Sequence, residues 1–183
     1  MIQLDRQRIL DALQELSRRL VQRGVTAEVC LFGGAAMIVA FQSRQTTKDI
    51  DAVFVPASVV RELAAEIGRE RGYEAGWFND GVKGFVSDRG EFTPANLPQF
   101  RNLRVMMPVP TYLLAMKCLA ARVATPDATD VQDVKFLLRH LGLREAEPVL
   151  AIVASYYPPS LIQPKTRYFV EAVVEEMQHE NPA

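Results

Sequence analysis

Two aspartates, Asp49 and Asp51, stand two residues apart in the segment 48–55, Lys-Asp-Ile-Asp-Ala-Val-Phe-Val, which ends in β-branched and apolar residues as a buried strand does. Side chains at positions i and i+2 of a strand point to the same face, so the two carboxylates converge while Ile50 and Ala52 point into a core. Carboxylates that converge repel each other and lose solvation unless a cation joins them. The pair therefore indicates a Mg²⁺ site, and the alternative is simply the solvated start of a strand.

A double glycine, Gly33-Gly34, lies between an expected strand at 28–32 and an apolar segment at 35–41. Such a turn leaves backbone N–H groups open to a phosphate, because no side chain blocks the approach. The sequence has neither the GxGxxG of dinucleotide-binding folds nor the GxxxxGK[ST] of P-loops, and Gly-Gly is also an ordinary turn. One helix and a polar connector fit between Gly34 and Asp49, so the turn and the carboxylates can be neighbours. A magnesium-bound triphosphate needs both features.

Three charged residues further along the chain extend this pattern. Lys117 is the only charge in the apolar run 112–121, where its amine either reaches the surface or faces an anion. Asp130 and Asp133 lie at positions i and i+3 of an expected helix. They either complement the dipole of that helix or belong to a site. Both interpretations stay open for all three residues.

The stretch 31–55 resembles the glycine motif and the DxD motif of minimal nucleotidyltransferases in the DNA polymerase β superfamily. More narrowly, Gly-Gly-Ala followed by an Arg, a Thr and Asp-Ile-Asp is similar to the AbiEii-like branch, which includes toxins of toxin–antitoxin pairs. Residues 110–138 match this branch more loosely. Together the similar segments make up about a third of the chain.

This resemblance implies an enzyme that moves a nucleoside monophosphate from an NTP to a hydroxyl on an acceptor. Asp49 and Asp51 would hold Mg²⁺ in a two-metal site, and Asp130 and Asp133 would join them in catalysis. The residues that would contact the nucleotide are Gly33, Gly34, Arg44, Thr47 and Lys117. The acceptor would be RNA, such as the 3′ end of a tRNA, or a protein, and an antitoxin would be a further partner.

The chain departs from the superfamily pattern in its third carboxylate, which usually lies on a later strand. Here the only acids between residues 80 and 107 are Asp88 and Glu91, and neither has a convincing strand context, since both lie in an irregular part of the sequence. Either Asp130 or Asp133 substitutes, or the protein is a catalytically inactive nucleotidyltransferase-like binding protein, such as an antitoxin. A third alternative is a haloacid-dehalogenase-like phosphohydrolase, whose DxDx[TV] loop residues 49–53 resemble. That loop follows an apolar strand, whereas Gln-Thr-Thr-Lys precedes the first aspartate here.

The elements that must position these residues form an α+β pattern. Strands are expected at 28–32, 48–55, 82–86, 91–93 and 101–107. Helices are expected at 5–23, 35–41, 58–71, 111–123, 127–141, 147–156 and 165–178. We therefore expect a small mixed nucleotidyltransferase-type sheet flanked by helices in residues 1–108, with an all-helical C-terminal lobe at 109–183 packed on it.

The composition of the 183-residue chain is that of a soluble globular protein, with 49% apolar and 23% charged residues. Its 21 basic and 22 acidic residues exclude a strongly basic surface overall, although the arginines of segment 5–23 are candidates for RNA phosphate contacts. Cys30 and Cys118 form no CxxC pair and are expected to be buried thiols, and two histidines are too few for a His/Cys zinc site. Without a long apolar run or a signal-peptide core, the expected protein is cytoplasmic and has no membrane partner.

Overall fold

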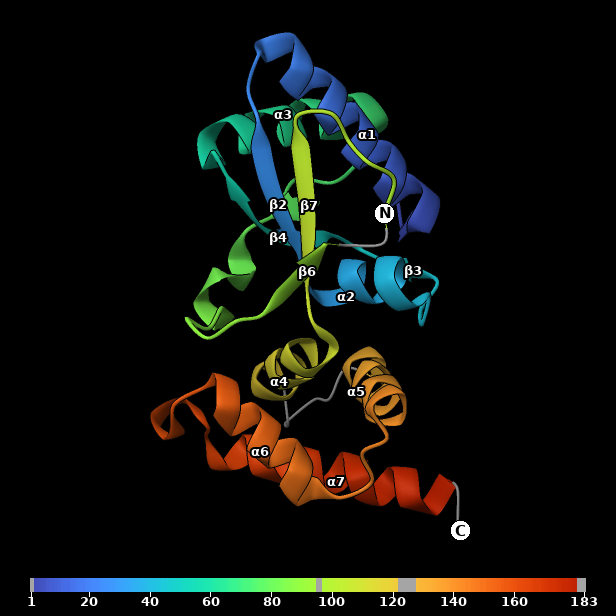
Figure 1. Ribbon diagram of the computed structural model, residues 1–183. Coiled ribbons are helices and arrows are strands. Elements are labelled where there is room, and N and C mark those ends of the chain that lie inside the picture. The colour runs from blue at the N-terminus through green and yellow to red at the C-terminus, as the bar shows by residue number, and fades with distance from the viewer. Residues whose placement is uncertain (1, 95–96, 122–127, 181–183) are drawn as a thin grey trace. The chain divides into compact units, whose positions relative to one another are not determined.

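The computed structural model describes residues 2–94, 97–121 and 128–180, and the chain divides into two compact units (Figure 1). The sheet unit comprises Met1–Gly84 and Phe92–Pro108, and the helical unit comprises Phe85–Glu91 and Val109–Ala183. A mixed sheet with flanking helices forms the first unit, and the second is helical. The predicted α+β class with a helical C-terminal region is confirmed.

The sheet unit is built on a five-stranded sheet with the strand order β5-β4-β2-β7-β6. Its strands are β2 (Ala27–Leu31), β4 (Ile50–Val55), β5 (Phe78–Asn79), β6 (Phe92–Pro94) and β7 (Leu103–Pro108). β2 runs antiparallel to β4 and parallel to β7, while β4 and β5 are parallel to each other. A separate two-stranded sheet joins β1 (Leu4–Asp5) to β3 (Thr46–Thr47). The antiparallel pairing therefore places the end of β2 beside the start of β4.

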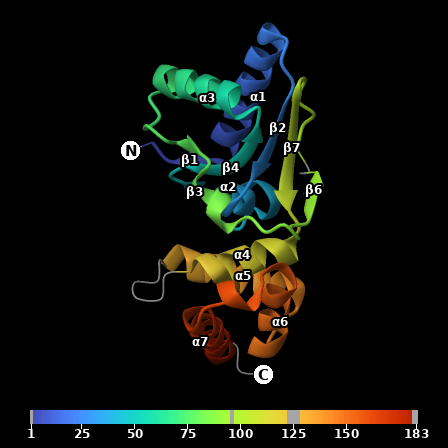
Figure 2. The same ribbon diagram turned by 90° about the vertical axis from the view of Figure 1, so that its left-hand side faces the viewer.

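Helices α1 (Arg6–Arg23) and α3 (Ala57–Arg71) lie on one side of this sheet (Figure 2). α1 begins where the Asp5 carboxylate accepts a hydrogen bond from the Arg8 N–H, and it ends at Gly24 in the left-handed conformation. Its apolar stripe of Ile9, Leu13, Leu16 and Leu20 is buried, as the spacing predicts. This stripe and the buried residues of α3 form the core of the unit together with the buried side chains of β2, β4 and β7.

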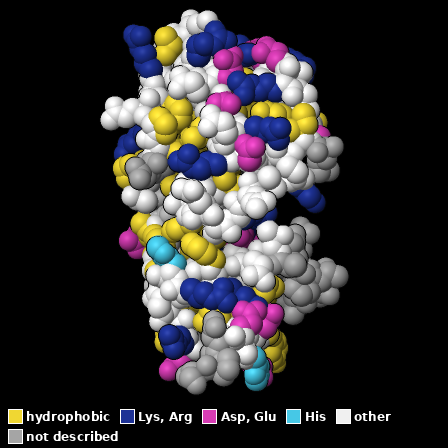
Figure 3. All heavy atoms as spheres, turned by 90° about the vertical axis from the view of Figure 1, so that its right-hand side faces the viewer, with side chains coloured by type: hydrophobic (Ala, Val, Ile, Leu, Met, Phe, Trp, Pro, Cys, Tyr) yellow, Lys and Arg dark blue, Asp and Glu magenta, His cyan; other side chains and the backbone are white. Residues whose placement is uncertain are grey.

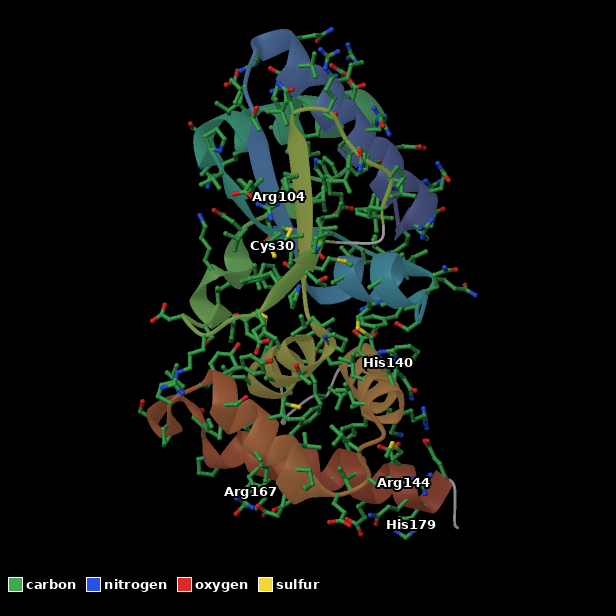
Figure 4. All side chains as sticks on the ribbon, in the orientation of Figure 1. Cys30, Arg104, His140, Arg144, Arg167 and His179 are labelled. Atoms are coloured by element: carbon green, nitrogen blue, oxygen red, sulfur yellow. The ribbon has the colours of Figure 1, made fainter. Side chains whose placement is uncertain are left out.

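Alternation along β4 sends its side chains to the two faces of the sheet. Ile50, Ala52 and Phe54 are buried, whereas Asp51 and Val53 are only half-buried on the opposite face. This confirms the predicted inward and outward assignment of the strand. Cys30 lies opposite Val53 on the same half-open face. The sequence predicts a buried thiol, whereas this thiol is only partly buried. Figure 4 labels Cys30 on β2 and Arg104 on the neighbouring strand β7.

Charges of both signs line the contact between α1 and α3. Arg19 pairs with Glu15, Glu66 and Glu70, and Arg23 pairs with Glu62 and Glu66. Figure 3 correspondingly shows basic and acidic side chains interspersed over the upper part of the view. Arg19 and Arg23, two of the arginines that the sequence offers as RNA contacts, are therefore paired with glutamates of α1 and α3.

The helical unit contains α4 (Pro110–Ala120), α5 (Ala128–Leu141), α6 (Ala146–Tyr156) and α7 (Pro164–Glu180). α4 packs against the other three helices, and its side chains from Tyr112 to Met116 are buried. The segment 85–91 belongs to this unit because the Ser87 N–H donates to the Tyr112 hydroxyl at 2.8 Å and the Tyr157 hydroxyl donates to the Phe85 carbonyl at 2.6 Å. Among the described residues, no helix combines the length and the apolar character that crossing a membrane requires.

Two local predictions differ from the structure, and three short strands were not predicted. The predicted strand at 82–86 is wrong, since a 3₁₀ helix (Gly81–Phe85) occupies that position. The predicted helix at 35–41 is an α-helical turn, α2 (Gly33–Ala36), that continues into a π-helical turn (Met37–Phe41). The two-residue strands β1, β3 and β5 were not predicted. The predicted helix ends at residues 123 and 127 lie outside the described residues.

Candidate functional site

Gly33 and Asp51 meet where β2 ends and β4 begins. Because β2 and β4 are antiparallel, with Leu31 opposite Ala52, the Phe32 N–H donates to the Asp51 carbonyl at 2.8 Å. Gly33 follows with φ = 54°, and a Cβ atom added to it would lie 2.6 Å from Asp51 Oδ2. Both the backbone conformation and the close approach favour glycine at this position. The turn and the carboxylate that the sequence pairs are thus in direct contact.

Gly34 packs against two further residues that the sequence assigns to the nucleotide. A Cβ atom on Gly34 would lie 2.7 Å from Thr47 Oγ1 and 2.9 Å from an Arg44 side-chain nitrogen. Thr47 is held in β3, which pairs with β1, and the Arg44 Nε–H donates to the Thr46 carbonyl at 3.2 Å. A guanidinium, a hydroxyl and a carboxylate therefore surround one glycine turn.

Asp49 immediately precedes β4 and is half-buried. The parallel pairing of β4 with β5 places Asn79 opposite Asp51, and the Asn79 Nδ2 donates a long hydrogen bond of 3.5 Å to Asp49 Oδ2. Sequence reasoning missed Asn79. A polar residue directly after the apolar pair Trp77-Phe78 was the available signal, because it is typical of the end of a short strand.

Comparison of the chain with protein-family models, curated proteins and solved structures gives no match. The chemistry of the site therefore has to follow from its own contacts.

The donor set fits a magnesium ion that arrives with a phosphate ligand. Within residues 2–94, 97–121 and 128–180, no group of three or more His, Cys, Asp or Glu side chains is placed to hold a metal by itself. Mg²⁺ does not require such a group, since one or two carboxylates commonly bind it together with water and substrate phosphates. Asp49 and Asp51 are the carboxylates that would serve here, and the Gly33-Gly34 turn lies against Asp51.

The other three predicted residues meet in the helical unit. Lys117 on α4 pairs with Asp130 at 2.9 Å and with Asp133 at 2.8 Å, both on α5. The lysine side chain is 11% exposed and that of Asp133 is 3% exposed. Burial by itself lowers the pKa of Lys117, but the charges of Asp133 and Asp130 outweigh it and the pKa is raised. Lys117 is therefore a charged amine held by two carboxylates.

The later strand β7 carries no acidic residue, as its sequence Leu-Arg-Val-Met-Met-Pro shows. Asp88 and Glu91 both belong to the helical unit, where Glu91 Oε1 accepts a hydrogen bond from the Tyr156 hydroxyl at 3.0 Å. Neither acid lies on a strand, since β6 begins at Phe92, one residue after Glu91. In the sheet unit, β5 places the amide of Asn79 beside Asp49.

Proposed function

We propose that this chain is a magnesium-dependent nucleotidyltransferase, similar to the AbiEii-like branch of the DNA polymerase β superfamily. It would transfer a nucleoside monophosphate from an NTP to an acceptor hydroxyl. The observation that supports this function best is the direct contact between the Gly33 turn and the Asp51 carboxylate. A phosphate-binding turn and a metal-binding carboxylate must be neighbours if one polyphosphate is to engage both.

Each residue of the sheet-unit site has a role in this reaction. Asp49 and Asp51 would hold magnesium, which when bound offsets the charge of the triphosphate and assists in-line attack at its α-phosphorus. The backbone N–H groups at Gly33 and Gly34 would bind phosphate oxygens. The Arg44 guanidinium and the Thr47 hydroxyl lie against Gly34 and would donate to the same oxygens.

The acceptor is proposed from the resemblance alone. An AbiEii-like enzyme would modify RNA, such as the 3′ end of a tRNA, or a protein side chain, and an antitoxin would oppose it. Lys117, Asp130 and Asp133 would be the counterparts of the lysine and the Asp-x-x-Asp of that branch. Their mutual pairing in the helical unit supports treating the three residues as one group.

A second candidate is a nucleotide-binding protein that transfers nothing, such as an inactive antitoxin-like relative. It is favoured by one observation, which is that β5 presents the Asn79 amide beside Asp49 rather than a third carboxylate. The phosphohydrolase alternative has less support. Asp49 stands at the start of β4, after the short polar strand β3, and not at the end of a buried strand.

The metal and nucleotide assignment is tested by calorimetry with ATP, CTP, GTP and UTP in the presence of Mg²⁺. We expect one or more of the four to bind, and we expect Asp49→Asn and Asp51→Asn each to weaken that binding at least about tenfold by removing one carboxylate ligand. Asp11→Asn is the control, because this exposed carboxylate on α1 lies outside the site. Unchanged affinity in both site variants would contradict the assignment.

Transfer is tested with NTPs labelled at the α- or the γ-phosphate, incubated with total RNA or with cell lysate. A nucleotidyltransferase leaves the α-label, and not the γ-label, on an RNA or protein acceptor. Binding without transfer of either label would instead favour the inactive relative. Release of phosphate from a simple phosphomonoester would favour the hydrolase.

A further inference from the structure

The turn after β5 fixes the orientation of the Asn79 side chain. Asn79 Oδ1 accepts a hydrogen bond from the Gly81 N–H at 2.9 Å, which forms an Asx-turn. The oxygen of the amide is thereby assigned, so the nitrogen is the atom directed away from the turn. This nitrogen lies 3.4 Å from the Gly76 carbonyl and 3.5 Å from Asp49 Oδ2.

The strand register places this amide on the face that carries the two carboxylates. Asn79 is the parallel partner of Asp51, and partners in adjacent strands share a face. The next residue, Asp80, is committed elsewhere, since its carboxylate pairs with Arg61 at 2.8 Å and with Lys83 at 2.5 Å. Asn79 is therefore the side chain of the β5 turn that meets Asp49.

We propose that Asn79 is a positioning residue of the Asp49–Asp51 site, to which it contributes a neutral amide and not a third carboxylate. The magnesium in this inference rests on the proposed function. The amide holds Asp49 in place without adding a charge, and among the described residues no third acid joins the two aspartates, which supply the negative charge of the ligand set. A set with two carboxylates binds a divalent cation weakly until the phosphates of a nucleotide add their own charge. The site thus takes up its cation together with the nucleotide.

The test is the affinity for Mn²⁺ in the absence of nucleotide, measured by electron paramagnetic resonance on the full chain. Asn79→Asp keeps the Asx-turn, because aspartate forms it as asparagine does, and adds a carboxylate beside Asp49. We expect Asn79→Asp to bind Mn²⁺ at least about tenfold more tightly than the wild-type chain, since cation affinity rises with ligand charge. Adding Asp51→Asn to that variant should remove the gain.

Asn102→Asp is the matched control for the change from amide to acid. Asn102 also lies in the sheet unit, but its Nδ2 donates to the Val25 carbonyl at 3.1 Å, away from the two aspartates. Its Mn²⁺ affinity should equal that of the wild type. If a folded Asn79→Asp variant also binds Mn²⁺ like the wild type, Asn79 only builds the turn and the inference is overturned.

The same measurements separate this inference from the proposed function. If the wild-type chain binds magnesium–nucleotide through Asp49 and Asn79→Asp gains no Mn²⁺ affinity, the inference fails and the proposed function stands. If the wild type binds no nucleotide while Asn79→Asp gains Mn²⁺ affinity through Asp51, the position of Asn79 is supported and the proposed function fails.

Discussion

Gly33 shows how much one missing side chain decides at the residue scale. Its positive φ disfavours other residues. One of its Cα hydrogens occupies the position at which a Cβ atom would overlap the Asp51 carboxylate. Gly24 has a similar φ of 63°, yet nothing lies within 4 Å of the Cβ atom it lacks. The two glycines therefore separate the cost of backbone conformation from the cost of the close approach to the carboxylate.

We expect Gly24→Ala to lower the free energy of unfolding by about 1 kcal/mol, because only the left-handed conformation is strained. Gly33→Ala should cost about 3 kcal/mol, because the added methyl group also displaces Asp51. It should weaken magnesium–nucleotide binding about tenfold or more, whereas Gly24→Ala should leave that binding unchanged. Urea unfolding and calorimetry measure the two effects. Equal losses at both positions would contradict a close contact at Gly33.

At the scale of elements, Lys117 joins α4 to α5 through Asp130 and Asp133. A buried pair is costly to break, because removal of one partner leaves the other charge without compensation. Sequence spacing could identify the lysine as unusual but not its partners. The faces through which two apolar helices contact each other depend on the packing between them. The helical pattern of one segment does not specify these faces.

Lys117→Met should lower the free energy of unfolding by about 3 kcal/mol, since it removes the ammonium group that pairs with the buried Asp133 carboxylate. Adding Asp133→Leu should recover at least about 1 kcal/mol of that loss, as expected for directly coupled residues. Lys165→Met on the exposed start of α7 is the control and should change stability by less than about 0.5 kcal/mol. A Lys117→Met variant as stable as this control would contradict the pairing.

The sequence predicts the position of elements with strong periodicity. It does not predict the position of elements that depend on distant contacts. α1, α3, β2 and β7 lie within a few residues of their predicted ranges. β5 has two residues and is held by Trp77, whose indole N–H donates to the Ala64 carbonyl on α3 at 2.9 Å. Its position thus depends on packing that no local pattern encodes.

The same distinction applies to the candidate site. Asp49, Asp51 and the double glycine are recognisable because both motifs are local. Because a strand is predicted at 82–86, the sequence pattern gives Asn79 no role. In the structure, the Asx-turn at Asn79 and the ion pair between Asp80 and Lys83 close the chain into a 3₁₀ helix at this position. The apolar residues of segment 82–86 are typical of a strand, but the turn-forming residues before them favour a 3₁₀ helix instead.

At the scale of the whole molecule, each unit contains one shielded thiol. Burial raises the pKa of Cys30 in the sheet unit and of Cys118 in the helical unit, each to about 12 from an ordinary 9. The folded chain therefore keeps both protons at a pH at which the unfolded chain releases them. The contribution of the two thiols to the free energy of unfolding is therefore fully present below pH 9 and is lost as the pH rises toward 12.

Cys118→Ala should remove part of this alkaline sensitivity. Between about pH 8 and pH 10.5, the wild-type free energy of unfolding should fall by about 2 kcal/mol more than that of Cys118→Ala, because one fully buried thiol no longer titrates. Urea unfolding with a reductant present measures both slopes. Cys30→Ala provides the comparison in the other unit. Parallel pH slopes in the wild type and Cys118→Ala would contradict the shielding of Cys118.

The route of the chain through its two units has a practical consequence for dissecting the protein. Residues 85–91 leave the sheet unit, bind Tyr112 and Tyr157, and return before the chain departs again after Pro108. A single cut at that proline would leave the N-terminal fragment with a loop that lacks its tyrosine anchors. The C-terminal fragment would lose the backbone groups that its tyrosines bind. Neither fragment is therefore a self-sufficient module, and two-fragment complementation would be expected to succeed where separate expression fails.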